Sequence, residues 1–156
     1  MDLETLADSY EASTVAFLDA VASLDPAHLD RRHPDAWSPR QVIHHVADSE
    51  AQSYARLRRL LAEQPNPVIQ GYDEAAWARS PRLGYKTLPV QPPLAVFAGV
   101  RSSSLALIRG LTEGDLDLAG THSESGAYTV RDWLAIYLEH PREHASQLER
   151  AARGEL

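Results

Sequence analysis

Two histidines four residues apart, His140 and His144, are the residues whose type and spacing point most directly to chemistry in this chain. Side chains at positions i and i+4 of an α-helix lie on the same face, one turn apart. Two imidazoles placed in this way can bind one metal ion, and a third ligand from another helix would complete the set. The pair alone is a weak motif, because the chain contains 7 His in 156 residues.

The segment around this pair has the pattern of an amphipathic helix. At about 100° per residue, one apolar stripe runs through the segment from Thr129 to Arg150. His144 falls within the stripe and His140 lies on its edge. Buried imidazole nitrogens need partners, because an unpaired buried polar group costs free energy. A metal ion would satisfy both rings, and so would hydrogen bonds to carbonyl groups, so the pair leaves both interpretations open.

A second helix supplies the candidate for the third ligand. Ser38, Pro39 and Gln41 form the pattern of a capping box, which predicts a helix that runs from there to about Ala62. His45 lies about 60° from Val42 around this helix, toward the buried side, whereas His44 lies about 160° away. His45 is therefore the one of the two adjacent histidines that we expect to point inward.

The composition narrows the class of protein. The net charge of −7 argues against nucleic-acid binding, and the chain has no apolar run long enough to span a membrane. The N-terminus lacks the features of a signal peptide, so we expect a cytoplasmic protein with one domain over residues 1–156. With 0 Cys, any metal is held by nitrogen and oxygen, and any reacting thiol comes from a second substrate.

A long connection separates the second helix from the third. Residues 63–91 contain four prolines, and a connection of this length is often functional. Within it, the run GYDEAAW at residues 71–77 predicts a short helix. The run is either a surface turn anchored by its aromatic residues or a lid that brings Glu74 to the metal. Glu74 or Asp73 is the candidate general base.

The pattern as a whole predicts an all-α fold. Helices over residues 2–23, 38–62, 92–110 and 129–150 form a four-helix bundle with a long connection between the second and third helices. Metal sites in such bundles are built from side chains that project inward from facing helices. Arg101 lies close to the apolar stripe of the third helix, so it either extends to solvent or lines a cavity. The polar segment 112–127 is expected to be a loop, with His122 exposed.

These motifs together resemble the DinB superfamily, and more closely its YfiT branch of metal-dependent hydrolases and bacillithiol S-transferases. The resemblance rests on WSPRQVIHHVADSEAQSYARLRRLL, on GYDEAAW and on the H-x-x-x-H pair, and it extends from Trp37 to Arg150. It implies a divalent metal held by His45, His140 and His144, the three histidines that the helical geometry selects. Zinc or nickel is expected first, with iron or manganese as alternatives, and we expect a homodimer.

The resemblance leaves several functions open. The first is a metal-dependent enzyme, a hydrolase or a thiol S-transferase, that acts on a small-molecule electrophile. In that case Arg56 or Arg101 would meet a carboxylate of the cosubstrate. The alternatives are a non-catalytic, dimeric metal-binding bundle that acts in a stress response, and a bundle whose histidines are ordinary core residues. Pro141 departs from the helical pattern beside His140, and a kink is expected there.

Overall fold

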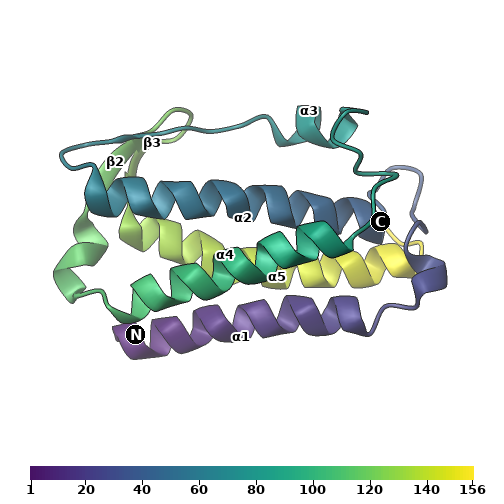
Figure 1. Ribbon diagram of the computed structural model, residues 1–156, viewed down its shortest axis with the longest axis horizontal. Coiled ribbons are helices and arrows are strands. Elements are labelled where there is room, and N and C mark those ends of the chain that lie inside the picture. Colours follow the sequence, from purple (N-terminus) through teal and green to yellow (C-terminus); the bar gives the residue numbers. More distant parts are fainter.

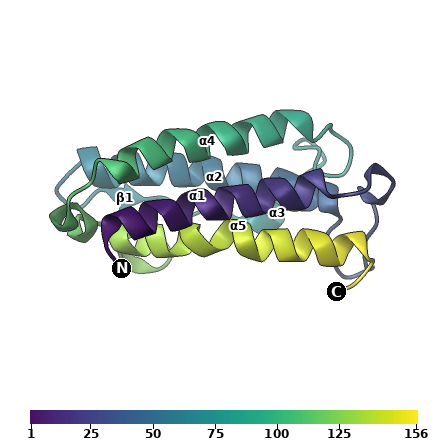
Figure 2. The same ribbon diagram turned by 90° about the horizontal axis from the view of Figure 1, so that it is seen from below.

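The computed structural model describes all residues 1–156 and confirms the four-helix bundle. Its long helices are α1 (Leu3–Ala22), α2 (Pro39–Ala62), α4 (Gln91–Arg109) and α5 (Val130–Ala152). They run alongside one another, with α2 and α1 on opposite sides of the bundle in Figure 1 and with α4 and α5 between them. Figure 2 shows the same arrangement from below. The two helices that carry the candidate ligands, α2 and α5, are therefore packing neighbours.

Helix caps determine where these helices begin. The Ser38 hydroxyl accepts from the Gln41 N–H, and the Gln41 side chain accepts from the Ser38 N–H in return, which confirms the predicted capping box of α2. Thr129 and Asp132 form an equivalent box at the start of α5. Each box supplies partners for backbone N–H groups that have none within the helix, and it thereby defines the register of the histidines that follow.

The connection between α2 and α4 contains more structure than predicted. The short helix α3 spans Glu74–Arg79, three residues later than expected at its start, because Asp73 is its N-cap. A two-residue strand, β1 (Val68–Ile69), precedes it. The segment predicted as a polar loop contains the 3₁₀-helix η2 (Glu113–Asp117) and the strands β2 (Ala119–His122) and β3 (Gly126–Thr129). A further 3₁₀-helix, η1 (Pro26–His28), links α1 to α2.

The three strands form a small sheet at one end of the bundle, in the order β1-β2-β3. β1 pairs with β2 in parallel, and β2 pairs with β3 antiparallel. A Cβ on Gly120 would stand 2.6 Å from the Pro67 carbonyl oxygen, so only glycine permits this close approach of the connection to β2. Strands of two to four residues carry almost no periodicity, which is why the sequence did not predict them.

The core consists of two apolar clusters with a polar layer between them. One cluster centres on Tyr10 and Trp133, and the other centres on Phe17 and Phe97. The residues between them on the four helices include buried polar and charged side chains: Ser13, Glu50, Ser53, Arg101 and Ser104. No helix combines the length and the apolar character needed to cross a membrane.

Candidate metal centre

The structure brings together the three histidines that the sequence singled out. The Nε2 atom of His144 lies 3.2 Å from Nε2 of His45 and 3.1 Å from Nε2 of His140. One ring nitrogen from each of the three residues lies within 4.8 Å of the other two. His45 is on α2 and the other two are one turn apart on α5, so the packing of these two helices creates the cluster.

A hydrogen bond fixes the tautomer of His144, so that the nitrogen facing the cluster is the one with a free lone pair. The Nδ1 atom of His144 lies 2.6 Å from the Gln147 side-chain oxygen, three residues later on α5. That oxygen only accepts hydrogen bonds, so Nδ1 carries the proton and Nε2 carries the lone pair. A partner of this kind, on the far side of a ligating ring, is typical of metal-bound histidine.

The electrostatics keep the three imidazoles neutral near pH 7. Burial, together with the charge of His144, lowers the pKa of His45 to about 4. Burial, together with the charges of the other two imidazoles and of Arg101, lowers the pKa of His140 to about 2. Burial also lowers the pKa of His144, and the hydrogen bond that its ring donates to Gln147 acts in the opposite direction. Because a metal ligand must be unprotonated, the site presents its histidines in the form that binds.

The spacing of the ring nitrogens fits a single ion. With Zn–N distances of about 2.0–2.1 Å, two nitrogens on one ion stand roughly 2.8–3.4 Å apart at angles between about 90° and 109°. The two measured separations, 3.1 and 3.2 Å, lie inside that interval. The other ring nitrogen of His45 and of His140, Nδ1, is buried and has no hydrogen-bond partner within the protein, in contrast to Nδ1 of His144.

The adjacent histidine of α2 points elsewhere, as the helical geometry predicted. The His44 Nε2 atom lies 3.2 Å from the Leu88 carbonyl oxygen, and its ring stacks on Tyr85. His44 is nevertheless buried, because the segment before α4 covers it. On the other side of α2, the Trp37 ring packs against His45 with 5.0 Å between centroids.

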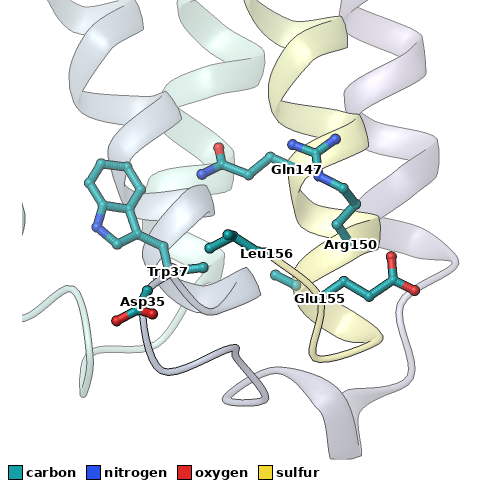
Figure 3. Close-up of a pocket in the computed structure, with 8 residues that line it drawn as sticks. Asp35, Trp37, Gln147, Arg150, Glu155 and Leu156 are labelled. Carbon is teal, nitrogen blue, oxygen red and sulfur yellow. The ribbon is translucent and has the colours of Figure 1, made fainter.

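A surface pocket of about 310 Å³ borders the centre (Figure 3). Trp37, which contacts His45, and Gln147, which contacts His144, face each other across it, with Leu156 beside them. The remaining labelled side chains are charged: Asp35, Arg150 and Glu155. Two of the residues that touch the histidines are thus also walls of a cavity large enough for a small molecule.

Comparison with known proteins places this arrangement in a family. The model of the DinB superfamily matches residues 9–148, which include all three histidines. The chain belongs to the DinB superfamily. A protein of Oceanobacillus iheyensis is 33% identical over 131 residues, 83% of this chain and 74% of its own length. One of Bacillus mycoides is 32% identical over 130 residues, 83% of this chain and 73% of its own. Both are named provisionally as metal-dependent hydrolases.

Two solved structures share the fold. YfiT from Bacillus subtilis, described as a probable metal-dependent hydrolase with an unusual four-helix bundle topology, superposes with a TM-score of 0.84 at 27% identity. The match covers 97% of this chain and 86% of YfiT. The four-helix bundle protein TT2238 superposes with a TM-score of 0.65 at 23% identity, over 95% of this chain and 98% of its own, and supports the fold alone.

The predicted acid–base residues of this DinB protein lie outside the histidine cluster. Asp73 caps α3, with its carboxylate accepting from the Ala76 N–H at 2.9 Å. Glu74 is exposed and makes no hydrogen bond to the three histidines. Partial burial of its carboxyl nevertheless raises the pKa of Glu74, against the charge of Arg56. Glu74 therefore faces the Arg56 side of α2 rather than the ligands directly.

The two predicted arginines occupy different surroundings. Arg56 donates to the Tyr137 hydroxyl at 3.3 Å and to the Gln70 carbonyl at 3.0 Å, and the Tyr137 ring lies 5.7 Å from that of His140. Arg101 is 1% exposed and pairs with Glu50. It does not extend to solvent, and it lies at the base of a surface pocket of about 200 Å³ between α1 and α4. Helix α5 continues through Pro141 from Val130 to Ala152, so the residue expected to kink the helix does not interrupt it.

Sequence reasoning missed Gln147 and the contact of Trp37 with His45. Gln147 had a usable signal, because it lies three residues after His144 on the same helical face. Trp37 was interpreted only as part of the start of α2. Its contact with His45 depends on how the chain enters the helix, and spacing alone does not specify that.

Proposed function

We propose that this DinB protein is a metal-dependent enzyme that uses His45, His140 and His144 to hold a divalent ion. The observation that carries the proposal is the convergence of three neutral imidazoles from two helices on one point. Three protein ligands leave further coordination positions open, as in catalytic rather than structural sites. The names of the related proteins support the same class of function.

The chain's own residues would orient the ligands and admit the substrate. A divalent ion bound to neutral imidazoles lowers the pKa of a bound water or thiol toward neutrality. Gln147 holds the lone pair of His144 toward the ion, and Trp37 shields one face of His45 from solvent. The pocket between these two side chains would receive the small-molecule electrophile.

The nucleophile is either water or the thiol of a small molecule. With 0 Cys, the chain supplies no thiol of its own. In thiol transfer, the thiol sulfur forms a bond to the electrophilic carbon, the leaving group departs with its electron pair, and the thiol proton passes to a base. We propose Glu74 as that base, because the pKa of its carboxyl is raised. Glu74 lies in the long connection between α2 and α4, near Arg56. Asp73 is the second candidate.

A carboxylate of the cosubstrate would be bound by side chains other than Arg101, whose donors all have protein partners. Arg56 remains a candidate. A second pocket, of about 570 Å³, borders Trp37 as well and is lined by Arg32, Arg79 and Lys86, none of which pairs with a carboxylate. Asp35 is its one acidic side chain. Its net positive lining favours an anionic group within a chain of charge −7.

The deciding experiment combines metal analysis with an activity screen. The untagged protein is analysed for bound metal and then reconstituted with zinc, nickel, iron or manganese. Each form is assayed for thiol consumption with a panel of electrophiles and for hydrolysis of the same panel without thiol. Metal-dependent loss of thiol indicates an S-transferase, and product formation without thiol indicates a hydrolase. Bound metal without either activity would favour the non-catalytic, dimeric stress-response bundle.

The role of Glu74 is tested by Glu74→Gln, with Glu124→Gln as the matched control from the same patch. A residue that accepts a proton in the reaction contributes about 10²–10⁴-fold in turnover. We expect that loss for Glu74→Gln at unchanged metal content, and little loss for Glu124→Gln. Equal turnover in the two variants would exclude Glu74 as the base, and Asp73→Asn would be measured next.

Substitution of the basic side chains that line the second pocket should weaken substrate binding. Arg79→Ala combined with Lys86→Ala is expected to raise KM for an anionic thiol while leaving kcat nearly unchanged. Arg82→Ala, which removes a nearby exposed charge outside the pocket, is the control.

Size-exclusion chromatography with light scattering would test the predicted homodimer, and fractionation of the source cells would test the predicted cytoplasmic location.

A further inference from the structure

Arg101 makes more polar contacts than any other side chain in the bundle. Its Nε donates to the Thr14 hydroxyl at 2.8 Å, and its Nη2 donates to the Tyr10 carbonyl and the Ser13 hydroxyl at 2.7 and 2.6 Å. Its Nη1 donates to a Glu50 carboxylate oxygen at 3.1 Å and to the Tyr137 carbonyl at 2.8 Å. A guanidinium has five N–H donors, so every donor of Arg101 is used.

The contact with the Tyr137 carbonyl compensates for Pro141. In a regular helix, this carbonyl would accept from the N–H of residue 141, four positions later. Proline has no N–H, so the intrahelical bond is missing at this position. The Nη1 atom of Arg101, which comes from α4, donates to the carbonyl instead. A side chain from a neighbouring helix thus replaces one backbone hydrogen bond of α5.

This replacement lies next to the histidine cluster on both of the helices that build it. Tyr137 stands three residues before His140 on α5, and Glu50 stands five residues after His45 on α2. The same Nη1 atom binds both Tyr137 and Glu50, and Glu50 is 0% exposed and also accepts from the Ser53 hydroxyl at 2.9 Å. One guanidinium group therefore connects the two ligand-bearing helices about one turn from their ligands.

We infer that Arg101 is a positioning residue that sets the distance between His45 and His140 through its paired contacts with Glu50 and the Tyr137 carbonyl. The inference rests on the metal centre proposed above. Because Pro141 has no N–H, the Tyr137 carbonyl of α5 needs a donor from outside the helix. Arg101 supplies that donor, and the contact of Arg101 with Glu50 on α2 fixes its orientation. A guanidinium directs five donors from one rigid plane, whereas the lysine ammonium is a compact point charge with three donors, so lysine cannot make the full set of contacts.

The test compares Arg101→Lys with Phe97→Leu. Lysine keeps a positive charge beside Glu50 but cannot occupy all five acceptors. Phe97→Leu removes packing one turn earlier on α4 without touching the polar layer, and it controls for a general loss of stability. The metal dissociation constant is measured by competition with a chromogenic chelator, and the visible absorption of the Co²⁺-loaded protein reports the ligand geometry. Neither readout needs an active enzyme.

We expect Arg101→Lys to weaken metal binding by about 10–100-fold, the usual range for a residue that supports a ligand, and to shift the Co²⁺ bands. Phe97→Leu should change neither. The decisive step is to repeat Arg101→Lys with Pro141→Ala, which restores the N–H that the Tyr137 carbonyl lacks. With Pro141→Ala present, the loss of metal affinity caused by Arg101→Lys should shrink to about threefold or less. The Tyr137 carbonyl then has a donor within α5, so the effects of the two substitutions are coupled.

Three outcomes would overturn the inference. Arg101→Lys could bind metal as tightly as Phe97→Leu, it could lose the same affinity with and without Pro141→Ala, or its Co²⁺ bands could stay unchanged. If Arg101→Lys does not fold, Glu50→Met is measured in its place, since it removes the acceptor through which Nη1 contacts α2. Unchanged affinity in that variant would equally overturn the inference. A wild-type protein that binds no metal would instead contradict the proposed centre itself.

Discussion

Two buried polar clusters lie close together in this bundle, and they differ in how completely their polar atoms are satisfied. Around Arg101 and Glu50, every guanidinium N–H has an acceptor within the protein. Around His45, His140 and His144, three ring nitrogens converge on one another, and two further nitrogens have no partner. Both clusters are buried and include residues of α2 and α5, so burial alone does not distinguish them.

The difference shows which of the two clusters is suited to bind something from outside. Burying a charge is tolerable when all of its hydrogen bonds are made, and the Arg101 cluster meets that condition without any added group. The histidine cluster avoids the cost of charge by staying neutral, yet it leaves lone pairs directed at one point. The Arg101 cluster holds the helices together by its own contacts, and the histidine cluster is the one that could hold a metal ion.

The largest expected effect comes from breaking the satisfied cluster. Arg101→Met leaves the Glu50 carboxylate buried without its partner, which typically costs about 3–5 kcal/mol in the free energy of unfolding. Urea denaturation of the metal-free protein measures this loss. Arg109→Met, which removes an exposed arginine from the same helix, is the control and should have a far smaller effect. Equal losses in both variants would show that the Arg101 cluster contributes no special stability.

Removing the metal tests the unsatisfied cluster. A ligand that binds only the folded state stabilises it by about 2.7 kcal/mol at a hundredfold excess over Kd. A chelator should therefore lower the melting temperature of the wild-type protein. His45→Ala should abolish this sensitivity, whereas His122→Ala, which alters a histidine outside the cluster, should retain it. A wild-type protein that contains metal and melts at the same temperature with and without chelator would contradict the proposed site.

The metal-free protein should lose stability as the pH falls from about 6.5 toward 4. The folded-state pKa of His45 is lowered to about 4 and that of His140 to about 2, whereas the unfolded chain titrates near 6.5. In this window the unfolded state binds more protons, so acid favours unfolding by about 1.4 kcal/mol per pH unit for each such histidine. Urea denaturation at several pH values measures the slope. A double variant, His45→Ala with His140→Ala, should have a flatter slope, and an unchanged slope would contradict neutral burial.

The smallest effect is expected at His44, next in sequence to a proposed ligand. His44→Ala removes one hydrogen bond to the Leu88 carbonyl, which contributes about 1 kcal/mol. Metal content should stay at the wild-type level, because the ring points away from the cluster. Elemental analysis of the purified variant checks this expectation. Loss of metal in His44→Ala with retention in His45→Ala would reverse the assignment of the two rings.

Much of the fold follows from short-range sequence patterns, namely helical periodicity and helix caps. Periodicity placed the four long helices, and the capping box at Ser38 placed the start of α2. The same periodicity separated His45 from His44, because adjacent residues on a helix differ by about 100° in direction. His140 and His144 followed from their spacing. Each of these inferences depends only on residues within one helix.

The sheet and the surroundings of the proposed catalytic residues could not be obtained in this way. β1 and β2 pair across more than fifty residues of chain, with Val68 opposite Thr121, and such pairing leaves no short-range signal. Glu74 was expected near the ligands because its segment connects two helices, but its position depends on how that segment folds back over α2. Asp73 was the alternative candidate base, and the sequence analysis did not predict that its carboxylate would cap α3.

By itself, then, the sequence determined the bundle and the three histidines of the proposed site, because helical periodicity and caps act over a few residues. Only the tertiary structure decided what surrounds them. It placed Arg101 between four helices, gave the Tyr137 carbonyl a donor that Pro141 withholds, and left two histidine nitrogens without partners. These features are contacts between side chains from different helices, and their distances depend on the packing of the whole bundle rather than on any one segment.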